Sequence, residues 1–211
     1  MSSCSHPVLR RLAAQHSPAW AEELPEPFVL RPDSPLSLAQ LADLFARRLS
    51  ELRGEAHYAP EVDDAVPILT HLVQRHGLTR VTCADVPWLT SLVHRAWWDP
   101  LTHDVRQADG SVTTAHVLIA DTGTVVVAAG PMAHRGATAL PRVHIVVAHR
   151  EQIVYSLGDA LTRIIDVAGN DGLPSDILFI TGPSRTSDIE KTLVIPAQGP
   201  AALHVILIEN G

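Results

Sequence analysis

A dense group of polar side chains follows the apolar run at residues 177–180. It comprises Thr181, Ser184, Arg185, Thr186, Ser187, Asp188 and Glu190, with Gly182 and Pro183 forming a turn inside it. Hydroxyls and a guanidinium are donors suited to a carboxylate or a phosphate. Ser187 and Glu190 have the spacing of a capping box, which predicts a helix whose free N–H groups also favour an anion. The segment therefore predicts an anion-binding loop.

The same segment has a simpler interpretation, in which it only caps a helix and Arg185 lies in solvent. Capping accounts for Ser187 and Glu190, but not for Arg185 and the further hydroxyls beside it. If a ligand binds, Asp188 and Glu190 are the candidate catalytic residues, because exclusion of water would raise the pKa of either carboxyl. Glu190 suits the capping box equally well, so the catalytic assignment stays open.

A second candidate segment, residues 120–124, places Asp121, Gly123 and Thr124 directly after another apolar run. The alternative is that Asp-Thr-Gly is only hairpin-turn chemistry. Gly199-Pro200, before the last apolar run, is typical of an ordinary turn.

The elements that would position these residues follow from hydrophobic periodicity. Helices are predicted over residues 37–54, 61–77, 86–98 and 155–169, and strands over 78–85, 142–149, 176–184 and 203–209, with a two-stranded hairpin over 114–130. Ser37 and Gln40 form a capping box, while Gly54 and Gly77 mark helix ends. Apolar strands separated by helices indicate an α/β domain with a mostly parallel sheet. Ligands bind at the carboxyl ends of such strands, where we expect the polar segment after residue 180.

Composition excludes several classes of protein. The chain has 211 residues, of which 46% are apolar, and 16 basic against 23 acidic residues. This acidic balance argues against binding to nucleic acid or to an anionic membrane surface. No apolar run reaches the roughly 20 residues of a membrane span. With Cys4 and Cys83 alone, we expect a reduced, cytoplasmic protein with no iron–sulfur cluster.

Twelve histidines raise the possibility of a metal site, but their spacing does not support one. His71 and His76 are five residues apart, as are His144 and His149, and this spacing places neither pair on one face of a helix or strand. We therefore expect no bound metal. His116 and His144 are the exceptions that could titrate near neutral pH.

Two further residue types have default structural interpretations. Without a neighbouring base, Cys83 is predicted to be a buried thiol and not a nucleophile. Trp97 and Trp98 are predicted to pack in the core, although an exposed tryptophan could instead anchor a partner protein.

Four segments together resemble the lactate-utilisation (LUD) domain family. They read IADTGTVVV, LPRVHIVVAHREQIV, ITGPSRTSDIEKTLV and GPAALHVILIENG, and the resemblance is clear from about residue 112 to 211. The first 34 residues are then an N-terminal arm and connector, and residues 35–211 a single domain with a helical part (35–77) and a sheet core (78–211).

The resemblance implies a three-layer α/β/α fold related to ribose-5-phosphate isomerase and coenzyme A transferases. It also implies a role with two iron–sulfur partner proteins in oxidising L-lactate to pyruvate. The implied functional surface comprises Thr181, Gly182, Ser184, Arg185, Thr186, Asp188 and Glu190, with Asp121, Gly123 and Thr124 nearby. The chain departs from the family at Gln198, where histidine is frequent, and glutamine cannot handle a proton in its place.

Three functional hypotheses remain. The first is a subunit of an L-lactate oxidation system that binds a small organic anion, or an anionic cofactor, at the loop Ser184–Glu190. The second is a non-catalytic scaffold that docks the iron–sulfur subunits. The third, by fold analogy alone, is a stand-alone enzyme of the isomerase or coenzyme A transferase type.

Overall fold

The computed structural model describes residues 34–97, 101–128, 136–168, 174–184, 186–187, 193–194 and 199–210. Contacts divide the chain into two units, Met1–Pro35 and Leu36–Gly211. The described elements all belong to the second unit, and the architecture below is that of this unit alone.

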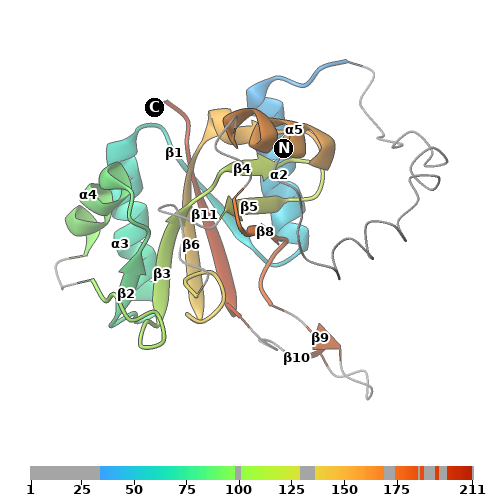
Figure 1. Cartoon of the computed structure of the whole chain (residues 1–211). Helices are drawn as coiled ribbons and strands as arrows, with labels where there is room; N and C mark the ends of the chain where they lie inside the picture. Colours follow the sequence, from blue (N-terminus) through green and yellow to red (C-terminus); the bar gives the residue numbers. More distant parts are fainter. Residues whose placement is uncertain are drawn as a thin grey trace, which may run out of the picture. The chain divides into compact units, whose positions relative to one another are not determined.

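The centre of the unit is a five-stranded sheet in the order β1-β11-β6-β3-β2, in which every neighbouring pair is parallel (Figure 1). The strands are β1 Glu55–Ala59, β2 Val81–Cys83, β3 Gly110–Thr114, β6 Val143–His149 and β11 Ala202–Ile208. Most of β6 and β11 is buried, as their Val- and Ile-rich sequences predict for strands covered on both faces. The predicted α/β class with a mostly parallel sheet is confirmed.

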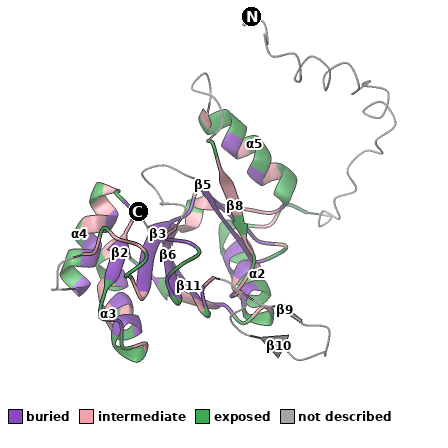
Figure 2. Ribbon diagram, turned by 60° about the horizontal axis from the view of Figure 1, so that its bottom comes forward, coloured by how far each residue is buried: buried purple, intermediate pink, exposed green. Residues whose placement is uncertain are grey.

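Two helices, α3 Ala65–Arg75 and α4 Pro87–Ala96, cover one face of this sheet. Figure 2 shows their buried sides turned toward the buried strands and their exposed sides turned outward. Both helices have apolar residues at helical spacing, and these meet Val112, Ile145 and Ile206 from the strands. Pro67 lies in the first turn of α3, where its missing N–H costs no intrahelical hydrogen bond.

The opposite face packs against α2 Leu38–Glu51 and a second, four-stranded sheet in the order β7-β4-β5-β8. Its strands are β4 Val117–Ile119, β5 Thr124–Ala128, β7 Ile153–Val154 and β8 Ile177–Ile180. The predicted hairpin is confirmed, because β4 and β5 are antiparallel around residues 120–123. Helix α5 Leu157–Ala168 packs on the far side of this mixed sheet. The sequence did not predict a second sheet.

Helix α2 begins with the predicted capping box, since Ser37 and Gln40 each accept the other's backbone N–H. Its end differs from the prediction. Arg53, with a φ of 67°, takes the left-handed position, while the N–H of Gly54 returns to the carbonyl of Leu49 at 2.9 Å. Gly54 is needed for space instead, because a Cβ there would lie 2.5 Å from Cδ1 of Leu49. Gly77 does end α3 as predicted, with a φ of 55°.

The strand that leads into the polar loop departs from the prediction. β8, which leads into it, pairs antiparallel with β5 at the edge of the mixed sheet, so the loop does not lie at the carboxyl end of the parallel sheet. Thr186–Ser187 form strand β9, antiparallel to β10 at Leu193–Val194. Asp188 and Glu190, on which the predicted helix start and capping box depend, lie outside the described residues, so the capping box stays a prediction.

Short elements complete the described part of the chain. Strands β1, β3 and β7 were not predicted, and two 3-10 turns are η2 Val62–Asp64 and η3 Arg150–Gln152. None of the helices in these described ranges combines the length and apolar character that crossing a membrane requires.

Candidate functional site

Three threonine side chains, here called the threonine cluster, meet where the mixed sheet ends. The Oγ1 atoms of Thr122 and Thr124 are 2.8 Å apart, and those of Thr124 and Thr181 are 2.9 Å apart. Thr122 belongs to the hairpin turn, whereas Thr181 follows β8. The antiparallel pairing of Val125 with Ile180 brings the two segments together. The structure thus joins Thr124 and Thr181, two residues that the family resemblance implies lie near each other.

The threonine cluster forms one edge of a cavity of about 380 Å³. The rest of its lining is apolar and comes from the first turns of α5 and from two strands: Leu157, Leu161, Ile119 and Phe179. Apolar walls with a few converging hydroxyls are typical of sites for small organic molecules. The cavity lies on the outer face of the mixed sheet, beside α5.

Gly123 and Gly182 serve to bring both segments close to the end of α2. Gly123 has a φ of 64°, and a Cβ there would lie 2.5 Å from the backbone nitrogen of Leu49. Gly182 has a φ of 88°, and its Cβ would lie 2.9 Å from the carbonyl oxygen of Leu52. Neither contact leaves space for a side chain, so these glycines seat the threonine cluster against the helix.

Asp121 lies next to the threonine cluster in a partly buried position. Burial raises the pKa of its carboxyl, although Thr122 and Arg48 act to lower it. Its Oδ1 atom is buried and has no hydrogen-bond partner within the described part of the chain.

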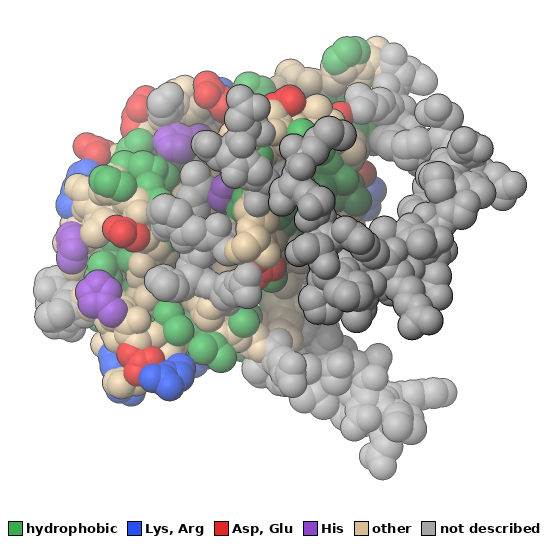
Figure 3. Space-filling view, viewed as in Figure 1, with side chains coloured by type: hydrophobic (Ala, Val, Ile, Leu, Met, Phe, Trp, Pro, Cys, Tyr) green, Lys and Arg blue, Asp and Glu red, His purple; other side chains and the backbone are tan. Residues whose placement is uncertain are grey.

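Ser184 lies at the start of the predicted anion-binding loop. Its backbone N–H donates to the carbonyl of Pro200 at 2.9 Å, so the Gly199-Pro200 turn lies beside the loop. Arg185, Asp188 and Glu190 lie outside the described residues, and of Thr186 only the backbone is described. An anion site built on these residues stays a prediction. On the face shown in Figure 3, the basic side chains among the described residues are few and form no continuous patch.

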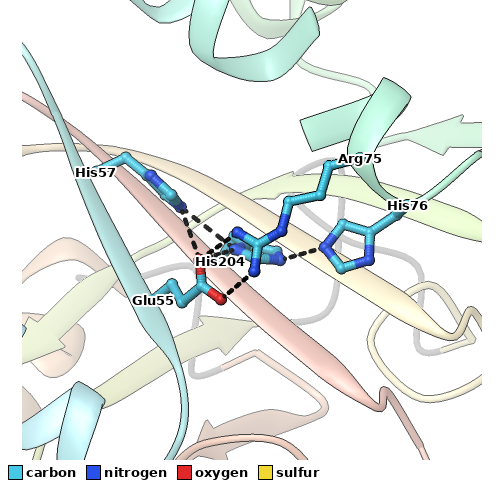
Figure 4. A network of polar contacts seen from close by, with 5 residues as sticks. All are labelled: Glu55, His57, Arg75, His76 and His204. Atoms are coloured by element: carbon cyan, nitrogen blue, oxygen red, sulfur yellow. Dashed lines mark hydrogen bonds and ion pairs between the residues drawn. The ribbon is translucent and has the colours of Figure 1, made fainter. Parts of the chain in front are cut away.

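A second polar cluster, which we call the histidine–glutamate cluster, lies between the parallel sheet and the end of α3 (Figure 4). It contains Glu55, His57, Arg75, His76 and His204. The His204 ring is in the middle, with its Nδ1 3.2 Å from Nε2 of His57 and its Nε2 2.8 Å from Nε2 of His76. Both guanidinium nitrogens of Arg75 donate to Glu55, at 2.6 and 2.8 Å.

In this cluster a charged neighbour has the largest effect on the pKa of Glu55, whereas burial has the largest effect on the pKa values of the three histidines. The hydrogen bond from Arg75 lowers the pKa of Glu55. Burial lowers the pKa of His57 and of His76, and brings the pKa of His204 to about 4. The three imidazoles are therefore neutral at pH 7, with their nitrogen lone pairs available as ligands or hydrogen-bond acceptors.

Sequence reasoning missed this cluster because it compared only histidine pairs along one element. The useful signal was Glu55-x-His57, since residues two apart on a strand share a face. His204 joins them because β1 and β11 are parallel neighbours with Glu55 opposite His204. No spacing along the sequence reveals that pairing.

The two histidines singled out from the sequence have structural roles. His144 is fully buried, its Nε2 lies 2.8 Å from Oγ1 of Thr113, and burial lowers its pKa to about 4. His116 accepts the backbone N–H of Ala128 through Nδ1, and burial lowers its pKa as well. The expectation that His144 titrates near neutral pH is wrong, because no charged group among the described residues offsets the cost of burying its charge.

The remaining default interpretations agree with the structure where it describes the residue. Burial raises the pKa of Cys83 to about 11, so its thiol is not activated. Trp97 is buried in the core beside α4, while Trp98 lies outside the described residues.

Comparison with known proteins identifies the family to which this chain belongs. A lactate utilization protein C of Halalkalibacterium halodurans is 32% identical over 185 residues, covering 81% of this chain and 80% of that protein. Another, from Geobacillus sp., is 29% identical, covering 67% of each chain. The crystal structure of a DUF162 family protein from Deinococcus radiodurans has the same fold, with a TM-score of 0.58, 21% identity, and coverage of 82% of this chain and 99% of that one. The LUD domain also matches residues 42–208, which include both polar clusters, and the chain therefore belongs to the LUD domain family.

Proposed function

We propose that this protein is a cytoplasmic subunit of a lactate utilisation system and binds a small organic anion beside the threonine cluster. The relatives named lactate utilization protein C support the biological role. The observation that carries the site is the meeting of Thr124 with Thr181 at the edge of an apolar cavity, because it unites two segments 57 residues apart. The two segments are those that the sequence singled out for chemistry.

The proposed ligand is a small hydroxy acid or keto acid such as L-lactate or pyruvate. Its methyl group suits the apolar wall formed by Leu157, Leu161 and Phe179. Its carboxylate would pair with Arg185, with further hydrogen bonds from Ser184 and Thr186. Asp188 and Glu190 remain the candidate proton acceptors.

Oxidation of lactate releases two electrons, which a second component must accept. The sequence has two cysteines, whereas an iron–sulfur cluster needs four protein ligands, in most cases cysteines. Iron–sulfur partner subunits, as the family resemblance implies, would take these electrons.

An apolar stripe on α5 favours partner docking as a second function of the same region. Leu157, Leu161 and Ile165 are 49%, 41% and 57% exposed, and their spacing of four residues places them along one side of the helix. Two of them also line the cavity. A partner subunit that covered this stripe would close the cavity from solvent. The scaffold hypothesis and the ligand hypothesis therefore concern one surface.

Ligand binding is tested by titrating the full chain with L-lactate, pyruvate and inorganic phosphate in a calorimeter. We expect Arg185→Ala and Thr124→Val to weaken binding of the preferred anion by about tenfold or more, since each removes a hydrogen-bonding partner. Arg47→Ala, at an exposed position of α2, is the matched control for Arg185→Ala. Thr70→Val, on α3, is the matched control for Thr124→Val. Equal affinity in wild type and Arg185→Ala would refute the anion site.

Docking is tested separately, by co-purification with the iron–sulfur subunits. Ile165→Glu should abolish assembly, because it replaces the most exposed residue of the apolar stripe by a charged one. Thr162→Glu adds the same charge to another exposed position of α5 and should leave assembly intact. Lactate oxidation by the assembled complex, measured with Arg185→Ala, then distinguishes a ligand site from a scaffold: loss of turnover without loss of assembly supports the ligand site.

A further inference from the structure

Three potential metal ligands in the histidine–glutamate cluster already have nearly the spacing of a coordination sphere. Nε2 of His57 and Nδ1 of His204 are 3.2 Å apart, and Oε2 of Glu55 lies 3.9 Å from the first and 3.6 Å from the second. Tetrahedral Zn²⁺ with bonds of about 2.0–2.1 Å holds its ligand atoms about 3.4 Å apart. The three atoms therefore lie close to three corners of such a tetrahedron.

The fold holds these three ligands on regular strands. Glu55 and His57 alternate along β1 and point to one face, and Glu55 is the register partner of His204 on β11. His204 is 1% exposed and forms the floor, whereas Glu55 and His57 are 42% and 23% exposed at the rim. A bound ion would keep one open position toward solvent, as in sites with three protein ligands and a water.

His76 supplies the outer support that metal-bound imidazoles require. Its Nε2 lies 2.8 Å from Nε2 of His204, so it can accept the Nε2–H proton of that ring. This hydrogen bond leaves the lone pair of His204 on Nδ1, the atom that faces Glu55 and His57. His76 follows the last residue of α3, and the Gly77 turn that ends the helix holds it in place.

Arg75 opposes metal binding, and replacing it is therefore the most informative test of the site. Its guanidinium occupies both carboxylate oxygens of Glu55 and would repel a cation beside them. The Arg75 side chain is 43% exposed, so it can leave Glu55 and point into solvent. An exposed ion pair of this kind contributes little stability, which a metal can readily outweigh.

We propose that Glu55, His57 and His204 form a binding site for a divalent transition-metal ion, with Zn²⁺ as the best fit, and that Arg75 and the metal compete for Glu55. A borderline-soft ion suits two imidazoles and one carboxylate, whereas Mg²⁺ and Ca²⁺ prefer all-oxygen sites. Binding requires neutral imidazoles, so a proton on Nε2 of His57 moves to Nδ1 of the same ring and the ion takes the freed lone pair.

The test is a calorimetric titration of the untagged full chain with ZnCl₂, at one protein concentration and at neutral pH. His57→Gln and Glu55→Gln each remove one ligand at the half-exposed rim and should weaken Zn²⁺ binding by about tenfold or more. His94→Gln, an exposed histidine on α4, is the matched control and should bind as wild type.

The competition gives an effect of the opposite sign. Arg75→Gln frees the carboxylate and should tighten Zn²⁺ binding by about tenfold, whereas Arg95→Gln, which breaks the comparable surface pair with Asp63, should not change it. A purely structural role for the cluster would not predict tighter binding in any variant. Circular dichroism of each variant shows that it is folded.

Cobalt provides a second readout. Co²⁺ in a tetrahedral site of nitrogen and oxygen ligands gives strong visible absorption bands, and these should appear with wild type and Arg75→Gln and be lost with His57→Gln. Three results would overturn the proposal: no Zn²⁺ binding by wild type and Arg75→Gln, unchanged binding by His57→Gln, or weaker binding by Arg75→Gln.

Discussion

Replacing Gly123 by alanine tests how closely the Asp-Thr-Gly turn approaches α2. Two separate costs are expected. The φ of 64° is in the left-handed region, which costs a residue with a Cβ about 1–2 kcal/mol. In addition, the new Cβ would lie 2.5 Å from the backbone nitrogen of Leu49 and 2.8 Å from the carbonyl carbon of Arg48. These are backbone atoms of a helix and cannot rotate away.

Gly77→Ala isolates the first cost. Gly77 has a φ of 55°, and a Cβ there would meet no atom of the described residues within 4 Å. It should therefore lose only the conformational term of about 1–2 kcal/mol. Gly123→Ala should lose a further ~1–3 kcal/mol, the usual range for overpacking a close contact. The helix and the turn must separate, and the threonine cluster beside Gly123 moves with the turn.

Differential scanning fluorimetry of the two variants at one scan rate measures the difference. For a domain of this size, 1 kcal/mol corresponds to about 2–4 °C, so Gly123→Ala should melt about 2–12 °C below Gly77→Ala. Anion binding measured well below both melting temperatures should weaken in Gly123→Ala alone. If the two variants melt together, or Gly77→Ala is the less stable, the turn does not rest on α2 as described.

Three further predictions concern stability and reactivity. His144 has a pKa of about 4 in the folded protein and about 6.5 in the unfolded chain, so the folded protein loses up to about 3 kcal/mol of stability as the pH falls from 6.5 toward 4. The His144→Gln variant should therefore show a flatter pH dependence of its free energy of unfolding, measured in urea. The raised pKa of Cys83 predicts slow alkylation by iodoacetamide at pH 8 until the protein unfolds, which mass spectrometry of the Cys83 peptide measures. Ser37→Ala removes half of the α2 capping box and should cost about 1 kcal/mol in the same urea unfolding experiment, and no loss of stability would contradict the cap.

Local patterns predicted the parts of the fold whose causes are local. The capping box at Ser37, the αL turn at Gly77 and the hairpin at residues 120–124 are each decided by hydrogen bonds within a few residues, and all three are present. The long apolar strands β6 and β11 were likewise predictable, because burial on both faces requires an uninterrupted apolar run.

Strands without an apolar run escaped prediction. β1 reads EAHYA and lies at the edge of the parallel sheet, where one side pairs with no described strand and polar residues are tolerated. β3 reads GSVTT and is fully buried, which is possible in part because the hydroxyl of Thr113 is paired with His144. In both cases the environment, and not the residue types, decides that a strand forms.

The sequence by itself determined the α/β class, the main helices and strands, and the two polar segments that meet at Thr124 and Thr181. Tertiary structure alone decided which sheet β8 joins, why Gly123 and Gly182 must lack side chains, and that Glu55 and His57 meet a histidine some 150 residues away. The physical reason is that periodicity and capping report on neighbours along the chain. Strand pairing and close packing depend instead on partners that folding brings together, and no local pattern encodes their identity.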